Sequence, residues 1–175
     1  MEIDMKKFLN LLSPKSLGHL LISLALLAVM PTANAADLPF VGTWKLVSQQ
    51  VTDAVTGEST SIFGANPRGT VTYTPDGHIF ALITATDRKP APPADDAQEA
   101  QLYRTASGIA GRYTVEGPGL IAYALDVATN PNLVGTKQLR QWKIEGDTLT
   151  VTTAKPMRGL NGKEVNFILI WTRDK

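Results

Sequence analysis

The side chains that could carry proton chemistry in this chain are few. His78 is the only histidine beyond residue 35, and Asp126 lies between two apolar residues, three positions after Tyr123. A carboxylate in an apolar setting can act as a general base, because burial raises its pKa. An enzyme of the cyclase or isomerase type would take its proton-transfer group from these three residues. Arg140 would then stabilise the negative charge that develops on the substrate.

A structural interpretation of the same residues stays open. Asp126 can instead form an ion pair with Arg112 or Arg140, and such pairs also perturb pKa values. Strand alternation places Arg140, Trp142 and Ile144 on one face. If that face points inward, the arginine needs an acidic residue or an anionic ligand beside it. If the face points outward, Arg140 is an ordinary surface residue, and the same question applies to Arg112.

Composition excludes several other kinds of chemistry. The 175 residues include no cysteine, so disulfides, thiolate metal sites and cysteine nucleophiles are absent. The sequence contains neither a Gly-x-Ser-x-Gly elbow nor a glycine-rich phosphate loop. With 17 basic and 16 acidic residues, it indicates no cationic surface for nucleic acid. We therefore expect no metal, no other cofactor and no nucleic-acid partner.

The N-terminus has the pattern of a secretory signal peptide over residues 1–35. Three lysines precede the uncharged apolar run at 20–29, and Ala33-Asn34-Ala35 places small residues at a cleavage site before Ala36. That run is shorter than the ~20 residues that span a membrane. We therefore expect export, to the periplasm in a Gram-negative bacterium and otherwise by secretion. The mature domain, 36–175, is expected to have no transmembrane segment and to be formally neutral.

Turn signals about ten residues apart indicate a meandering, antiparallel all-β domain after the leader. The first strand is expected at 43–52, with Trp44 and Leu46 on one face and Val47 and Gln49 on the other. Pro75-Asp76-Gly77 predicts a hairpin turn. The remaining strands are expected at 59–62, 71–74, 79–84, 110–116, 120–127, 135–145, 148–153 and 164–173.

One segment of the mature domain is not strand-like. The prolines of 89–93 exclude helix and sheet, and Asp95 or Asp96 can then cap a helix over 97–105. We interpret residues 89–108 as a lid over an open end of the sheet structure, and a free surface helix is the alternative. Residues 79–83 and 167–171 are apolar at consecutive positions, which predicts strands buried on both faces or facing an apolar cavity. Closure into a barrel of eight to nine strands satisfies this pattern and leaves no exposed edge.

Gly42-Thr43-Trp44 opens the first strand, and several later segments accompany it in order and spacing. These are 42–48 (GTWKLVS), 63–77 (FGANPRGTVTYTPDG), 111–116 (GRYTVE), 130–140 (NPNLVGTKQLR), 145–151 (EGDTLTV) and 171–173 (WTR). Together they resemble the bacterial and fungal lipocalin-like domain family over residues 40–174. The resemblance implies an up-and-down lipocalin-like β-barrel of the calycin type and does not specify a ligand. It also implies that Gly42 and Trp44 form a structural signature, with Arg173 or Arg140 stacked on the indole.

The chain departs from that family at one place. Many members carry two consecutive histidines before the acidic residue of the strand that leads to Asn-Pro-Asn, where this chain has Tyr123-Ala124 before Leu125-Asp126. Whatever those histidines do in relatives therefore does not carry over. Tyr123 can donate a hydrogen bond, but it cannot shuttle a proton at neutral pH.

These observations favour a container for a small apolar or amphipathic ligand, with or without an acidic group. The residues expected to contact the ligand are Tyr73, Phe80, Arg112, Tyr123, Arg140 and Trp142. A non-hydrolytic enzyme that uses the same cavity is the alternative, and a protein-interaction module of the cell envelope is a third hypothesis. A filled lumen would favour the interaction module, and a buried carboxylate beside Arg140 would favour the enzyme.

Overall fold

The computed structural model describes residues 38–88, 95–159 and 162–175. The predicted signal peptide, 1–35, and the proline-rich loop, 89–93, lie outside these described residues. No helix in the described ranges is long and apolar enough to cross a membrane.

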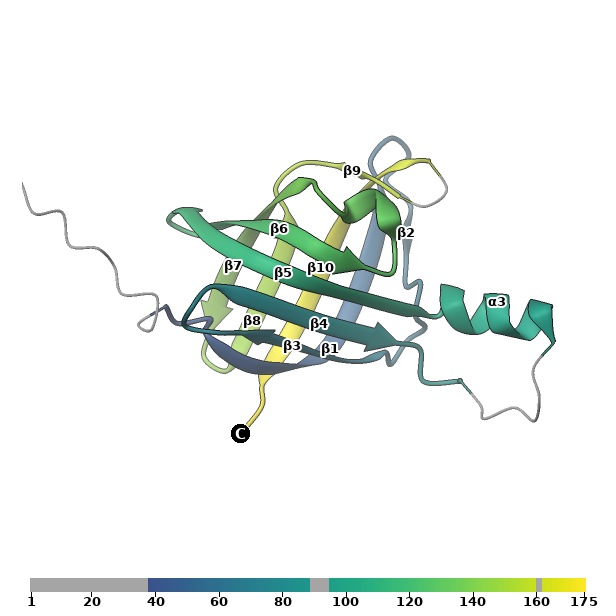
Figure 1. Ribbon diagram of the computed structural model, residues 1–175, viewed down its shortest axis with the longest axis horizontal. Helices are drawn as coiled ribbons and strands as arrows, with labels where there is room; N and C mark the ends of the chain where they lie inside the picture. Colours follow the sequence, from purple (N-terminus) through teal and green to yellow (C-terminus); the bar gives the residue numbers. More distant parts are fainter. Residues whose placement is uncertain (1–37, 89–94, 160–161) are drawn as a thin grey trace, which may run out of the picture. The chain divides into compact units, whose positions relative to one another are not determined.

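The described strands form one antiparallel sheet of ten, eight of which close into a barrel (Figure 1). The barrel closes through β1 (Gly42–Asp53), which pairs with β3 (Arg68–Tyr73) on one side and β10 (Glu164–Arg173) on the other. The other barrel strands are β4 (His78–Thr84), β5 (Ala106–Gly117), β6 (Leu120–Ala128), β7 (Lys137–Glu145) and β8 (Thr148–Thr153). Two short strands, β2 (Ser59–Thr60) and β9 (Met157–Arg158), pair with β1 and β10. The predicted antiparallel barrel is confirmed.

The turns explain where the strands begin and end. The predicted hairpin at Pro75-Asp76-Gly77 joins β3 to β4, and its glycine has a φ of 87°. The strand predicted at 135–145 begins later, at Lys137. A short 3-10 helix, η2 (Pro131–Leu133), precedes it, and Gly135 has a φ of 73°, which a β-strand does not contain.

A β-bulge in β1 reverses the alternation predicted for the first strand. The pairing of β1 with β10 skips Val47, which has no partner there. One extra residue moves every later side chain of that strand to the other face. Trp44 and Gln49 are both buried in consequence. The prediction that they lie on opposite faces was wrong.

Trp44, Arg173 and Gly42 meet at one end of the barrel. The indole of Trp44 is fully buried, and the guanidinium carbon of Arg173 lies 4.2 Å from its ring centroid. This is a stacked cation–π contact, and Arg173 rather than Arg140 is the arginine that makes it. Gly42 has a φ of 124°, and a Cβ there would lie 3.5 Å from Nη1 of Arg173.

Phe40 closes that end from inside. Its side chain is 1% exposed, and its ring makes edge-to-face contacts with Tyr73, Tyr113 and Trp142 at centroid distances of 5.2, 5.4 and 4.9 Å. The carbonyl oxygen of Phe40 accepts a 2.8 Å hydrogen bond from Nε1 of Trp44. The residues just before β1 therefore seal the barrel with aromatic rings.

The predicted helix is present as α3 (Asp96–Arg104), which leads into β5 (Figure 1). It starts with a capping box. The carboxylate of Asp95 accepts from the backbone N–H of Gln98 at 2.9 Å, and Oε1 of Gln98 accepts from the N–H of Asp95 at 3.2 Å. No residue of α3 is buried, so its role as a lid stays a prediction.

Candidate functional site

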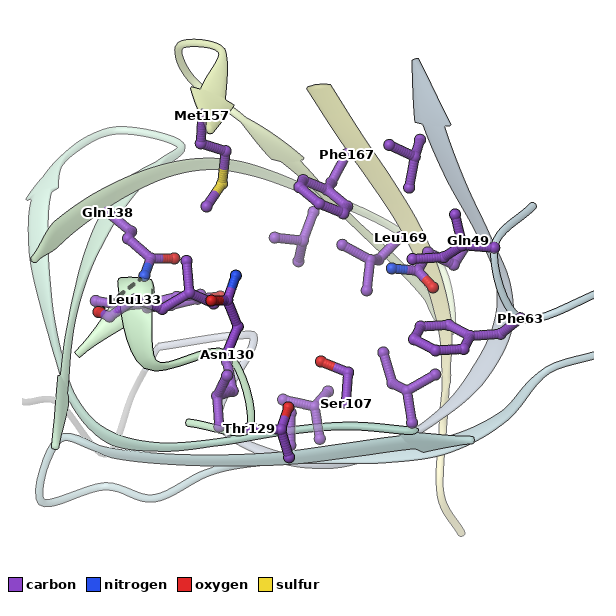
Figure 2. Close-up of a pocket in the computed structure, with 18 of the residues that line it drawn as sticks. Gln49, Phe63, Ser107, Thr129, Asn130, Leu133, Gln138, Met157, Phe167 and Leu169 are labelled. Carbon is purple, nitrogen blue, oxygen red and sulfur yellow. Dashed lines mark hydrogen bonds between the residues drawn. The ribbon is translucent and has the colours of Figure 1, made fainter. Parts of the chain in front are cut away.

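The barrel lumen contains a cavity of about 390 Å³, shown in Figure 2. Its wall is mostly apolar, because the inward positions of successive strands carry aliphatic residues. On β4 the inward residues are Ile79, Ala81 and Ile83, all buried. Further apolar contributions include Val51, Val71, Val151, Phe167 and Leu169. The volume lies in the range of small-molecule pockets, roughly 300–1,000 Å³.

Arg140 is the charged side chain buried in this wall, only 9% exposed. Its Nη2 donates to Oε1 of Gln138 at 2.6 Å and to Sδ of Met157 at 3.1 Å, and its Nη1 donates to the carbonyl oxygen of Leu139 at 3.1 Å. None of the ion pairs among the described residues includes it. Burial lowers its pKa from 12.5, yet an arginine stays protonated at neutral pH. The predicted strand face therefore points inward and presents a buried cation.

Two tyrosines lie next to this guanidinium. The hydroxyls of Tyr73 and Tyr123 are 2.5 Å apart, and the guanidinium carbon of Arg140 lies 5.6 Å from the ring centroid of Tyr123. Burial raises the pKa of Tyr123 to about 12 and that of Tyr73 well above 10.0, so both are protonated at neutral pH. Only one of the two protons is used in the bond between the hydroxyls. The other can be donated to a ligand.

The charges along the cavity have one sign. The described residues that line it include three arginines, Arg104, Arg140 and Arg158, and no aspartate or glutamate. Arg104 ends α3 and Arg158 lies on β9. Both segments lie at the end of the barrel away from Phe40, as the strand pairings show. The charged side chains of the described cavity wall, buried or at the open end, therefore all favour negative charge in a ligand.

Gln49 is a lining residue that sequence reasoning missed. It is 6% exposed, and its Oε1 is buried without a hydrogen-bond partner. The bulge at Val47 turns it inward, and no pattern in the sequence revealed that bulge. Gln138, also buried in the wall, could have been found, because alternation along β7 places it with Arg140.

His78 and Arg112 come together outside the lumen. Nδ1 of His78 lies 3.1 Å from a carboxylate oxygen of Asp76, and Nη1 of Arg112 lies 2.9 Å from Nε2 of His78. Arginine can only donate, so Nε2 accepts and Nδ1–H donates to Asp76. Both His78 and Arg112 are exposed, and neither lines the cavity. Arg112 points outward because its neighbour Tyr113 points inward, so it does not line the cavity.

Three other candidates also lie away from the cavity wall. Phe80 is 51% exposed, because it alternates with the inward Ile79 and Ala81 on β4. The outer face of β4 is uncovered, so of the two alternatives predicted for this segment the one that holds is that it faces an apolar cavity. Asp126 is exposed on β6 and joins neither arginine in the described ion pairs. Trp142 points inward but packs on Phe40 at the closed end.

The helix contributes to the cavity only through its last turn. Tyr103 and Arg104 line the open end, and the hydroxyl of Tyr103 donates to the carbonyl oxygen of Thr129. The expected contacts Tyr73, Tyr123 and Arg140 therefore line the cavity together, whereas Phe80, Arg112 and Trp142 do not. Their binding role stays a prediction.

Comparison with known families agrees with this architecture. The sequence profile of a lipocalin-like domain matches residues 41–174, nearly all of the chain that the structure describes. No curated protein matches the chain significantly. A barrel of this kind fits a role in binding small molecules. This chain belongs to the lipocalin-like domain family.

Proposed function

We propose that this protein binds a small amphipathic molecule whose anionic group, such as a carboxylate, contacts Arg140 inside the barrel. The observation that carries the proposal is a buried guanidinium in an apolar wall whose described lining residues include no carboxylate. A buried cation is costly unless an anion or several hydrogen bonds compensate it. A ligand carboxylate would supply that anion.

The surrounding groups support the same assignment. In the Tyr73–Tyr123 pair one hydroxyl is not used as a donor, and it can donate to the carboxylate oxygen that does not contact Arg140. The aliphatic wall then covers the apolar body, and each Å² of apolar surface removed from water contributes about 25 cal/mol. Arg104 and Arg158 at the open end favour the approach of an anion.

The residues that line the cavity favour binding over proton-transfer chemistry. A general base must lie within reach of the substrate. Asp126 and His78 do not line the cavity, and the two tyrosines of the hydroxyl pair hold their protons at neutral pH. The same cavity argues against a solid barrel that serves only as an interaction module.

The test compares dodecanoate with dodecanol by isothermal titration calorimetry. We expect dodecanoate to bind more tightly to the unmodified protein. Arg140→Met should weaken dodecanoate binding by about 1.5–3 kcal/mol, tenfold or more, because a hydrogen bond to a charged group is lost. Binding of dodecanol should change little. Arg112→Met, on the outer face, is the matched control and should leave both affinities unchanged. Equal losses for acid and alcohol in Arg140→Met would contradict the proposal.

We also propose that the protein is exported, on the basis of the leader at 1–35. Expression of the whole chain in its host, followed by N-terminal sequencing of the product, tests this. A mature N-terminus at Ala36 outside the cytoplasm is expected. An intact Met1 on cytoplasmic protein would refute export. Native mass spectrometry of the same material would identify any ligand that co-purifies.

A further inference from the structure

A second polar group faces the lumen from the wall across from Arg140. Figure 2 shows the amide of Gln49 beside Leu169 and Phe63, with Gln138, the partner of Arg140, on the opposite side of the cavity. The Gln49 side chain is more than nine-tenths buried, and its Oε1 has no hydrogen-bond partner.

Strand pairing gives the spacing between the two groups. Gln49 pairs with Leu169, Leu169 with Val151, and Val151 with Trp142, which is two residues from Arg140 on the same strand face. Gln49 is thus three strand steps and one inward position from Arg140. Three steps of about 4.8 Å and one inward position of about 6.6 Å along the strand put the two backbones about 16 Å apart along the wall. Both side chains extend inward, so their polar ends are closer than that. A compact molecule can reach both ends.

The unpartnered Oε1 of Gln49 destabilises the folded protein, because a buried polar atom has lost its water without gaining another hydrogen bond. An aliphatic side chain of similar size would not have this cost. Rotation about the last side-chain bond exchanges the amide oxygen and nitrogen, so either atom can be turned toward the lumen. The missing partner of Oε1 is a hydrogen-bond donor.

We propose that Gln49 is a second contact for the ligand, and that the ligand carries a neutral hydroxyl across the lumen from its anionic group. This rests on the function proposed above and specifies the ligand further. A hydroxyl can donate to Oε1 and accept from Nε2, so it fits either orientation of the amide. The ligand class is a hydroxylated organic acid with a compact apolar body.

The test uses two rigid probes, 6-hydroxy-2-naphthoate and 2-naphthoate, which differ only in the hydroxyl opposite the carboxylate. The unmodified protein should bind the hydroxylated probe about threefold to tenfold more tightly, the range of one net hydrogen bond. Gln49→Leu should abolish or reverse this preference. It should also bind 2-naphthoate at least as tightly as the unmodified protein does. Gln50→Leu, the same change at the next, exposed position of β1, should keep the preference.

The outcomes separate this inference from the binding function on which it rests. If both probes bind and Arg140→Met weakens both, but Gln49→Leu keeps the hydroxyl preference, the inference is wrong and the binding function stands. If neither naphthoate binds the unmodified protein although dodecanoate does, the inference is wrong and the binding function stands. If none of the three binds, both are wrong. An NMR measurement does not depend on the stability of the variant. The side-chain NH₂ signals of Gln49 should shift with 6-hydroxy-2-naphthoate more than with 2-naphthoate, and equal shifts would count against the contact.

Discussion

Replacing Arg140 with methionine should make the ligand-free protein more stable while it weakens ligand binding. The guanidinium is 9% exposed and belongs to no ion pair among the described residues. Removing such a charge from water costs several kcal/mol even after the protein relaxes. Methionine fills a similar volume without that cost.

The hydrogen bonds of Arg140 offset only part of this. The carbonyl oxygen of Leu139 also accepts from the backbone N–H of Ala154, so it keeps a partner in the variant. The main loss is the 2.6 Å bond to Oε1 of Gln138, because the contact with Met157 is a weak one through sulfur. We therefore expect a net gain of about 1–3 kcal/mol in the free energy of unfolding.

The assay is equilibrium unfolding in urea of protein freed of ligand, with thermal unfolding as a second measure. A gain of 1 kcal/mol corresponds to about 2–4 °C in Tm for a domain of this size. Arg112→Met on the outer face is the control and should change the unfolding free energy by less than about 1 kcal/mol. An Arg140→Met protein less stable than the unmodified one would refute the view that the guanidinium is kept for binding.

Two further predictions concern the frame of the barrel. Gly111→Ala should destabilise the protein by several kcal/mol or prevent folding, because the new Cβ would lie 2.2 Å from the carbonyl oxygen of Ala124. Circular dichroism and urea unfolding measure this loss of stability. Gly117→Ala is the control and should be tolerated, because a Cβ there would have no atom within 4 Å. Asp53 has its pKa lowered from 3.8 to about 2 by two backbone N–H bonds and Lys163. The stability that this carboxylate contributes is present above pH 4 and is lost as pH falls toward 2, so the difference in unfolding free energy between the unmodified protein and Asp53→Asn should shrink over that interval. A constant difference would contradict the assignment.

The barrel could be predicted because its signals are local and repeat along the chain. Turn residues mark nearly every hairpin, and the apolar inner face of β4 follows from simple alternation. The inward direction of Arg140 could be predicted only in part from the sequence. Alternation grouped it with Trp142, but the register of the closed sheet was needed to decide which face is inside.

The parts that were missed depend on long-range geometry. The bulge at Val47 is a mismatch between two strands more than a hundred residues apart in the chain, and no residue near it marks the position. It alone turns Gln49 inward. Phe80 was expected to contact the ligand, yet it lies on the outer face of β4, which nothing in the described barrel covers. Hydrophobicity alone cannot tell an inner face from an uncovered outer one.

The aromatic seal formed by Phe40 and Trp44 has a consequence for exchange. Because that end of the barrel is blocked, a ligand would enter and leave through the open end, past Arg104 and Arg158. The open end would therefore control how long a ligand stays bound. The two arginines there attract an anion, so its association rate constant should fall as the salt concentration rises. For the binding function proposed above, the buried lining of the lumen would determine affinity, and the residues at its open end would determine the rate of exchange.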